Sequence, residues 1–274
     1  MSRNVATETV TPVRAELDIA GRRLSYVDFG GPGRPLLALH GHLSEGASFA
    51  VVAAGLAPEW RIIAPDQRGH GDSDRAADYS REGYLADILT LLDHLGLDRV
   101  AIVGHSLGGI NAYHLAARHP ERVAALVNAD APVALGLDGE SNPLAFLERL
   151  PYRAPTREAL IEALGEAAPY FTETLRENPD GTWRLPFHPQ DMLASEELNR
   201  GDHWAAWLAT TCPALVIRGT EGSVIPADQA EAMVTRRPNT RLAELPTDHF
   251  VYANDPAGFV RAVGDFLASL EFTG

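Results

Sequence analysis

Apolar runs alternate with helical patterns along most of the chain. The run Pro-Leu-Leu-Ala-Leu at 35–39 is continuously apolar, which is typical of a strand covered on both faces of a parallel sheet. Strands that alternate with amphipathic helices predict βαβ units. We therefore expect an α/β fold with a mostly parallel central sheet covered by helices. The predicted strands are residues 15–20, 22–28, 35–39, 61–64, 100–103, 123–128, 214–217 and 241–245, and the predicted helices are residues 84–95, 107–118, 227–236 and 256–270.

The pattern changes in the middle of the chain. After Asp130-Ala-Pro132, seven prolines interrupt short helical pieces up to about residue 208. We interpret residues 133–208 as a helical cap, or lid, inserted into a core formed by residues 15–132 and 209–274. Residues 1–14 lack sustained periodicity and are expected to form a flexible tail.

The charge of the chain limits its partners. It has 23 Lys+Arg against 37 Asp+Glu, a formal net charge of −14, which repels phosphate backbones and anionic membranes. We therefore expect a small-molecule substrate and no nucleic-acid or membrane partner. The single cysteine, Cys212, cannot form an intramolecular disulfide, and the first residues lack the apolar stretch of a signal peptide. A cytoplasmic protein, monomeric or homodimeric, is expected.

The segment Gly104-His105-Ser106-Leu107-Gly108 fits Gly-x-Ser-x-Gly and lies where a predicted strand turns directly into a predicted helix. Glycine on either side lets the neighbouring backbone approach a sharp turn without Cβ clashes. The turn would lift the serine hydroxyl above the sheet at a helix N-terminus, where free N–H groups favour developing negative charge. We predict that Ser106 is a nucleophile and that the Leu107 N–H is an oxyanion donor.

A serine hydroxyl needs a base within hydrogen-bond reach, and the base needs an orienting partner. Among ten histidines, His249 has the best position, because it lies in the loop between the last predicted strand and the last predicted helix. The edge of the sheet can bring this loop to Ser106. We therefore predict that His249 is the general base.

These residues resemble the α/β-hydrolase fold family from about residue 15 to residue 270. The motifs that carry the resemblance, in the family's order, are His40-Gly41, residues 66–73, the Gly-x-Ser-x-Gly segment, residues 212–219 and His249. The resemblance implies the α/β-hydrolase fold with a cap, and a second oxyanion donor in the backbone N–H of His42. For the His42 side chain, contact with substrate and simple space filling are both open.

The acid departs from the commonest family pattern, in which an aspartate follows the strand that here ends at Arg218-Gly219. This chain has Gly222 at the corresponding position. A known variation, seen in some haloalkane dehalogenases and fungal lactone hydrolases, places the acid after the sixth strand, where this chain has Asp130. We predict Asp130 as the acid. Glu221 is the alternative, because its longer side chain could reach the imidazole from next door.

The resemblance implies a serine mechanism, and Ser106 at the elbow excludes the epoxide hydrolases and haloalkane dehalogenases, which use aspartate there. We expect hydrolysis of a small, moderately apolar ester or lactone through an acyl-enzyme. A C–C bond hydrolase stays open, as does a non-hydrolytic lyase, cyclase or small-molecule receptor. No cofactor or metal is expected, because the sequence has no zinc-spaced His/Cys cluster, phosphate loop or dinucleotide motif.

The predicted cap is rich in aromatic residues, which could line an apolar pocket. Most of these residues could equally pack the cap onto the core. The residues predicted to line the pocket are His40, Gly41, His105, Trp183, Phe187, Trp204 and Phe250.

Overall fold

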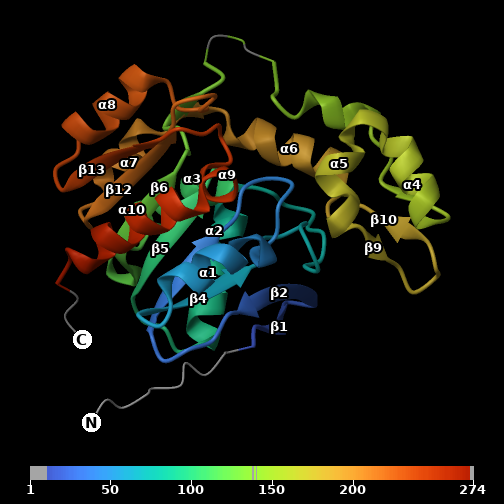
Figure 1. Cartoon of the computed structure of the whole chain (residues 1–274), viewed down its shortest axis with the longest axis horizontal. Coiled ribbons are helices and arrows are strands. Elements are labelled where there is room, and N and C mark those ends of the chain that lie inside the picture. The colour runs from blue at the N-terminus through green and yellow to red at the C-terminus, as the bar shows by residue number, and fades with distance from the viewer. Residues whose placement is uncertain (1–10, 138, 140, 272–274) are drawn as a thin grey trace.

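An eight-stranded sheet forms the core of the computed structural model, which describes residues 11–137, 139 and 141–271 (Figure 1). The strand order is β1-β2-β4-β3-β5-β6-β12-β13. Strands β1 and β2 pair antiparallel, and β2 joins β4 antiparallel, whereas the strands from β4 to β13 are parallel. The strands are β1 (Val13–Ile19), β2 (Arg22–Asp28), β3 (Arg34–Leu39), β4 (Trp60–Pro65), β5 (Val100–His105), β6 (Val123–Ala129), β12 (Ala214–Gly219) and β13 (Thr240–Leu245).

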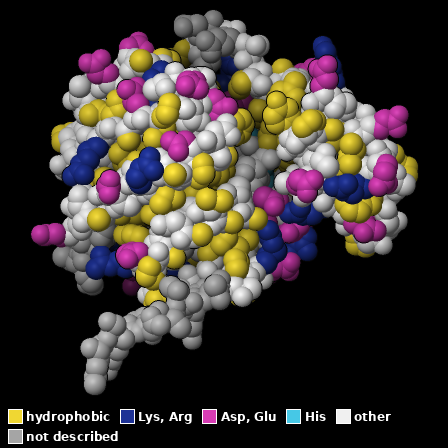
Figure 2. Space-filling model, viewed as in Figure 1, with side chains coloured by type: hydrophobic (Ala, Val, Ile, Leu, Met, Phe, Trp, Pro, Cys, Tyr) yellow, Lys and Arg dark blue, Asp and Glu magenta, His cyan; other side chains and the backbone are white. Residues whose placement is uncertain are grey.

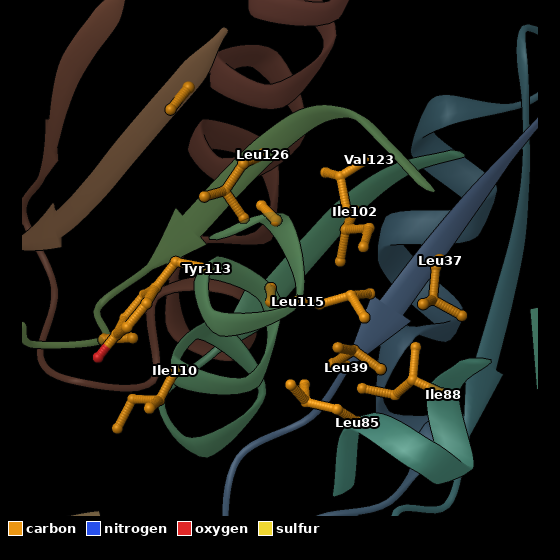
Figure 3. Close-up of a cluster of buried hydrophobic side chains, with 14 of the residues drawn as sticks. Leu37, Leu39, Leu85, Ile88, Ile102, Ile110, Tyr113, Leu115, Val123 and Leu126 are labelled. Carbon is orange, nitrogen blue, oxygen red and sulfur yellow. The ribbon is translucent and has the colours of Figure 1, made fainter. Parts of the chain in front are cut away.

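Helices cover both faces of this sheet. In β3, Leu37 and Leu39 face the cluster beneath α2 and α3, while Leu36 and Ala38 face the cluster beneath α1 and α10. Two buried faces explain why the run at 35–39 is continuously apolar. Figure 3 shows the first cluster, in which α2 and α3 pack against β3, β5 and β6. The core helices are α1 (Ala50–Leu56), α2 (Arg81–His94), α3 (Leu107–Arg118), α8 (Ala227–Thr235), α9 (Val251–Asn254) and α10 (Pro256–Ala268).

Most of the described chain between β6 and β12 forms a lobe beside the sheet, whereas α7 at its end lies against the core (Figure 1). This lobe has its own apolar cluster, which extends onto Tyr79, Tyr84 and Leu107 of the core. Its small sheets have the orders β8-β10-β9 and β11-β7. The elements are β7 (Ala134–Leu135), β8 (Arg153–Ala154), α4 (Arg157–Leu164), α5 (Ala168–Phe171), β9 (Arg176–Glu177), β10 (Trp183–Arg184), α6 (Pro189–Asn199), β11 (Gly201–Asp202) and α7 (Trp204–Ala209).

The predicted α/β architecture with a mostly parallel sheet is confirmed. Other features were not predicted: α1, α9, the two-residue strands of the lobe, and the packing of α7. Residues 13 and 14, predicted to belong to the tail, are the first residues of β1, and residues 1–10 lie outside the described part of the chain. Trp207 of α7 is buried against α3 in the core cluster. The predicted boundary of the cap at residue 208 therefore cuts through a helix that packs on the core.

The surface of the core and the lobe carries both signs of charge. Figure 2 shows acidic and basic side chains interspersed over both on one face of the molecule. Among the described residues, no helix combines the length and apolar character needed to cross a membrane.

Candidate active site

Ser106 occupies a sharp turn between β5 and α3, with φ 51° and ψ −120°. The two flanking glycines are also needed because any side chain there would collide with neighbouring backbone. A Cβ on Gly108 would lie 2.1 Å from the carbonyl oxygen of Leu39, and one on Gly104 would lie 2.4 Å from that of Gly108. Any side chain at these positions would push backbone apart, so the turn needs the Gly-x-Ser-x-Gly pattern.

His249 and Asp130 meet although 119 positions separate them. His249 lies in the loop between β13 and α9, and its Nδ1 is 2.8 Å from Oδ2 of Asp130, which follows the last residue of β6. The carboxylate is completely buried, whereas the imidazole is 21% exposed. A carboxylate on Nδ1 fixes the ring and leaves Nε2 as the nitrogen for proton transfer.

The loop after β12, where the commonest family pattern places the acid, instead donates hydrogen bonds to the Asp130 carboxylate. The carboxylate accepts hydrogen bonds from the N–H of Gly219 at 3.3 Å, the N–H of Val224 at 3.1 Å and the hydroxyl of Ser223. Gly222 has φ 137°, a conformation that side chains rarely adopt, and the side chain of Glu221 is exposed. This geometry favours Asp130 over Glu221 as the partner of His249.

His105 connects the serine turn to the histidine loop. Its Nε2 lies 2.8 Å from the backbone oxygen of His249, and the two rings are 4.6 Å apart. Burial, together with the nearby His249, lowers the pKa of His105 to about 3. A neutral ring bound in this way carries its hydrogen on Nε2 and donates it to the carbonyl. His105 therefore holds the His249 backbone beside Ser106.

Two backbone N–H groups flank this arrangement. Leu107 is the first residue of α3, and His42 lies in a turn closed by a hydrogen bond from Ser44 N to Gly41 O. In the described part of the chain, no loop or side-chain hydrogen bond uses either N–H. An N–H at a helix N-terminus and a second N–H in an adjacent turn are the elements of an oxyanion hole.

Strained backbone is concentrated at this end of the sheet. Five described residues other than glycine have positive φ, and three of them are Leu43 (64°), Ser106 (51°) and Asp130 (50°). Each follows closely on the carboxyl end of a parallel strand: β3, β5 and β6. Such residues cost free energy and are typical of functional sites, so the strain marks the same place as the side chains.

Comparisons with known proteins identify the family of this chain. The family model described as the alpha/beta hydrolase fold matches residues 34–256. The chain belongs to this family. It is 31% identical to the 2-hydroxymuconate semialdehyde hydrolase of Pseudomonas sp. (strain CF600), over 97% of this chain and 98% of that protein. The predicted family is therefore confirmed, and the protein is a hydrolase.

Solved structures show the same fold in this α/β hydrolase. The crystal structure of E-2-(acetamidomethylene)succinate hydrolase superimposes with a TM-score of 0.80 at 26% identity, covering 94% of this chain and all of the other. The enol-lactonase from Burkholderia xenovorans LB400 has a TM-score of 0.74 at 22% identity, covering 93% and 100%. At that lower identity, the likeness concerns the fold alone.

The residues predicted for the pocket divide into two groups in this α/β hydrolase. Gly41, His105 and Phe250 lie beside the catalytic candidates. A Cβ on Gly41 would be 3.0 Å from Cβ of Ser106, and the ring of Phe250 is 5.4 Å from that of His249. Phe250 is half exposed, so it can form an outer wall.

The other predicted pocket residues have partners elsewhere. His40 is completely buried and its Nε2 accepts from the Gln67 N–H at 2.9 Å, and burial lowers its pKa to about 4. The remaining three are aromatic: Phe187 stacks edge-on against Phe171 in the lobe, Trp183 lies under Arg157, and Trp204 lies 4.0 Å under Arg236, which follows α8. Packing thus accounts for these rings.

A cleft of about 530 Å³ opens between the loop at 69–75 and the β9–β10 hairpin of the lobe. None of the predicted site residues lines it. Arg176 closes one side by pairing with Glu45 at 2.6 Å and with Asp72 at 2.9 Å. Within the described residues, no group of three potential metal ligands occurs.

Residues of α6 contact the side chain of His42 in the turn at residues 41–44, and sequence reasoning missed them. The His42 ring contacts Ser195 and Glu196, and Tyr84 of α2 contacts Ser195. Burial lowers the pKa of His42 well below its usual value and raises that of Glu196. No local pattern identifies them, because only the docking of α6 brings them to His42.

Proposed function

We propose that this hydrolase cleaves a small, moderately apolar ester or lactone through a Ser106-His249-Asp130 triad and an acyl-enzyme. The observation that carries the proposal is the 2.8 Å contact between His249 Nδ1 and Asp130 Oδ2, beside a serine in a strained strand-to-helix turn. A serine, an imidazole and a buried carboxylate in this order have the chemistry of acyl transfer.

The steps follow from these positions. His249 Nε2 takes the Ser106 proton as Oγ attacks the substrate carbonyl, and the N–H groups of His42 and Leu107 receive the negative charge. The tetrahedral intermediate collapses to an acyl-enzyme as His249 protonates the leaving oxygen. Water, activated by the same imidazole, then releases the acid and restores Ser106. Asp130 stabilises the imidazolium formed in both halves.

A second candidate is hydrolysis of a C–C bond next to a carbonyl. It is favoured by the 31% identity with 2-hydroxymuconate semialdehyde hydrolase over nearly the full length of both chains. The serine, the histidine and the oxyanion donors would be the same in both reactions. The bond that is cleaved depends on the substrate pocket.

The test is turnover of short aryl esters, aromatic lactones and vinylogous 1,5-diketones by the wild type and by Ser106→Ala. Ester or lactone turnover that Ser106→Ala abolishes, with rapid labelling of Ser106 by a fluorophosphonate, would support the proposal. Turnover of the diketones alone would favour the second candidate. Slow labelling without any turnover would instead indicate a receptor, lyase or cyclase.

A further inference from the structure

The His42 side chain is held by the helix α6 of the lobe. Its Nε2 lies 2.9 Å from Oγ of Ser195, whose hydroxyl is also 2.8 Å from the hydroxyl of Tyr84. Ser195 is completely buried and Tyr84 is 2% exposed. A serine hydroxyl has one hydrogen to donate and can accept another, so it can satisfy both neighbours at once.

The contacts at the two ring nitrogens of His42 can form one directed chain. Nδ1 of His42 lies 3.3 Å from Oε2 of Glu196. With the ring hydrogen on Nδ1, His42 faces the Glu196 carboxyl as a donor and accepts at Nε2 from Ser195, which accepts from Tyr84. The imidazole is thereby fixed at both nitrogens, and its orientation fixes the backbone to which it is attached.

A second set of contacts ties the same turn to the serine helix. Asn199 of α6 donates to Glu196 at 3.3 Å and accepts from Arg81, which also donates to Asn111 of α3. Asn111 in turn donates to Gln67 at 2.7 Å, and Gln67 donates to the carbonyl of His40 at 2.6 Å. The turn at residues 41–44 is therefore braced from the core side and from α6.

Helix α6 is also anchored at its first turn. Asp191 accepts two hydrogen bonds from Arg75, at 2.7 and 2.8 Å, and one from Tyr79 at 2.8 Å. Figure 1 shows α6 running between the core and the outer part of the lobe, which consists of α4, α5, β9 and β10. The position of Ser195 relative to His42 thus depends on how the lobe is docked.

From these contacts we infer that Ser195 is a positioning residue for the oxyanion hole, acting through the His42 side chain. This inference rests on the proposed serine mechanism. The donor N–H of His42 is correctly aimed only while α6 supplies the Ser195 hydroxyl, so the lobe completes the catalytic machinery. Ser195 contributes to the transition state without touching it, because its effect passes through the orientation of His42.

The test compares Ser195→Ala, Ser195→Thr and Tyr84→Phe on the best substrate of the wild type. Removing an oxyanion donor outright costs about 10²–10³ in kcat, and a misaimed donor should cost less. We expect Ser195→Ala to lower kcat by about 10- to 100-fold with KM nearly unchanged, and to weaken a trifluoromethyl ketone inhibitor by the same factor. Ser195→Thr, which keeps the hydroxyl, should recover most of the rate, and Tyr84→Phe should lose less than Ser195→Ala.

The matched control is Ser25→Ala, because Ser25 is equally buried and lies in β2, where its hydroxyl pairs with Arg14. It should lower Tm without changing kcat. If Ser195→Ala lowers Tm as Ser25→Ala does and leaves kcat and the inhibitor unchanged, Ser195 is structural only and the inference is wrong. A raised KM at constant kcat would also overturn it, in favour of a substrate contact.

A measurement without turnover separates this inference from the proposed function. In ¹⁵N-labelled wild type, His42 should show a neutral imidazole with its hydrogen on Nδ1, and Ser195→Ala should shift the backbone amide signal of His42. An unchanged amide signal would overturn the inference, whatever the substrate. A wild type that turns over nothing and resists fluorophosphonate, yet shows the shift, would mean that the proposed function fails while the positioning contact stands.

Discussion

Asp130 Oδ2 lies 2.8 Å from His249 Nδ1, and the other oxygen of the same carboxylate accepts the Ser223 hydroxyl. The loop after β12 therefore donates hydrogen bonds to the Asp130 carboxylate, which follows the end of β6. Because four groups converge on this fully buried carboxylate, its position is fixed within the fold. A carboxylate held in this way keeps the His249 imidazole in one orientation.

Replacing Asp130 with asparagine should lower kcat by about 10⁴-fold, because an amide at this place favours the wrong tautomer of His249. Steady-state hydrolysis of the best ester substrate is the measurement, with circular dichroism to verify the fold.

Glu221→Gln is the control for this change, since the exposed Glu221 side chain was the alternative acid. Its kcat should stay within about twofold of the wild type. A collapse of activity in Glu221→Gln with Asp130→Asn still active would reverse the assignment of the acid.

Gly108→Ala should destabilise the protein by about 3 kcal/mol or more, because its Cβ would lie 2.1 Å from the carbonyl oxygen of Leu39 and 2.7 Å from that of His40, and this backbone cannot yield as a flexible side chain does. The contrasting variant is Gly264→Ala within α10, whose Cβ would meet only Leu56 at an ordinary 3.6 Å. That change should stabilise by about 0.5–1 kcal/mol. Urea denaturation gives the free energy of unfolding of both variants. Equal changes in that free energy for Gly108→Ala and Gly264→Ala would contradict the prediction.

Glu196 should make stability fall as pH rises above about 4.3, the ordinary glutamate value. Burial raises the pKa of its carboxyl in the folded protein, so the folded state keeps a proton that the unfolded chain has lost. The loss of stability from ionising the buried Glu196 carboxyl reaches its full size once the pH exceeds the pKa of that group in the folded protein. Glu196→Gln should therefore raise Tm at pH 8 and change it little at pH 4.

Calorimetry across pH on three proteins tests this expectation: the wild type, Glu196→Gln, and Glu162→Gln, which changes an exposed glutamate of α4. The Glu162→Gln variant should follow the wild-type curve. A Glu196→Gln variant whose Tm gain is the same at pH 4 and pH 8 would count against a raised pKa.

The Arg75-Asp191 pair should couple by about 0.5–1 kcal/mol, since Arg75 is half exposed and its attraction to Asp191 is screened by solvent. A double-mutant cycle of Arg75→Ala and Asp191→Ala measures this coupling free energy, with the stability of α6 followed by hydrogen exchange of its backbone amides. The coupling should shrink when salt is raised, as screening predicts. Coupling that does not change with salt would mean that packing, rather than charge, connects the two.

How much the sequence reveals depends on how local each feature is. The run at 35–39 predicts β3 because every side chain in it is apolar, and the Gly-x-Ser-x-Gly segment predicts the turn because only glycine fits there. Helix α1 was missed, since it is seven residues long and contains Gly55. The family and the fold follow from such local signals and are confirmed by the comparisons.

The surroundings of the site depend on tertiary packing, which leaves no local signal. Trp204 was predicted for the pocket on aromatic content alone, yet its ring lies under Arg236. Ser195 is one of many serines in the sequence, and nothing near it indicates that α6 places its hydroxyl on His42. The predicted catalytic roles of Ser106, His249, Asp130, His42 and Leu107 stay predictions that the geometry supports.

The three strained residues Leu43, Ser106 and Asp130 have a consequence for engineering this protein. Each positive φ costs a non-glycine residue on the order of 1 kcal/mol, and the site keeps that cost in every folded molecule. Selection for heat resistance alone would therefore favour replacing these residues and losing activity. Selection for heat resistance and turnover together should leave all three residues unchanged and find stabilising substitutions in other parts of the protein. The strained turns of the site therefore limit the stability that an active enzyme can reach.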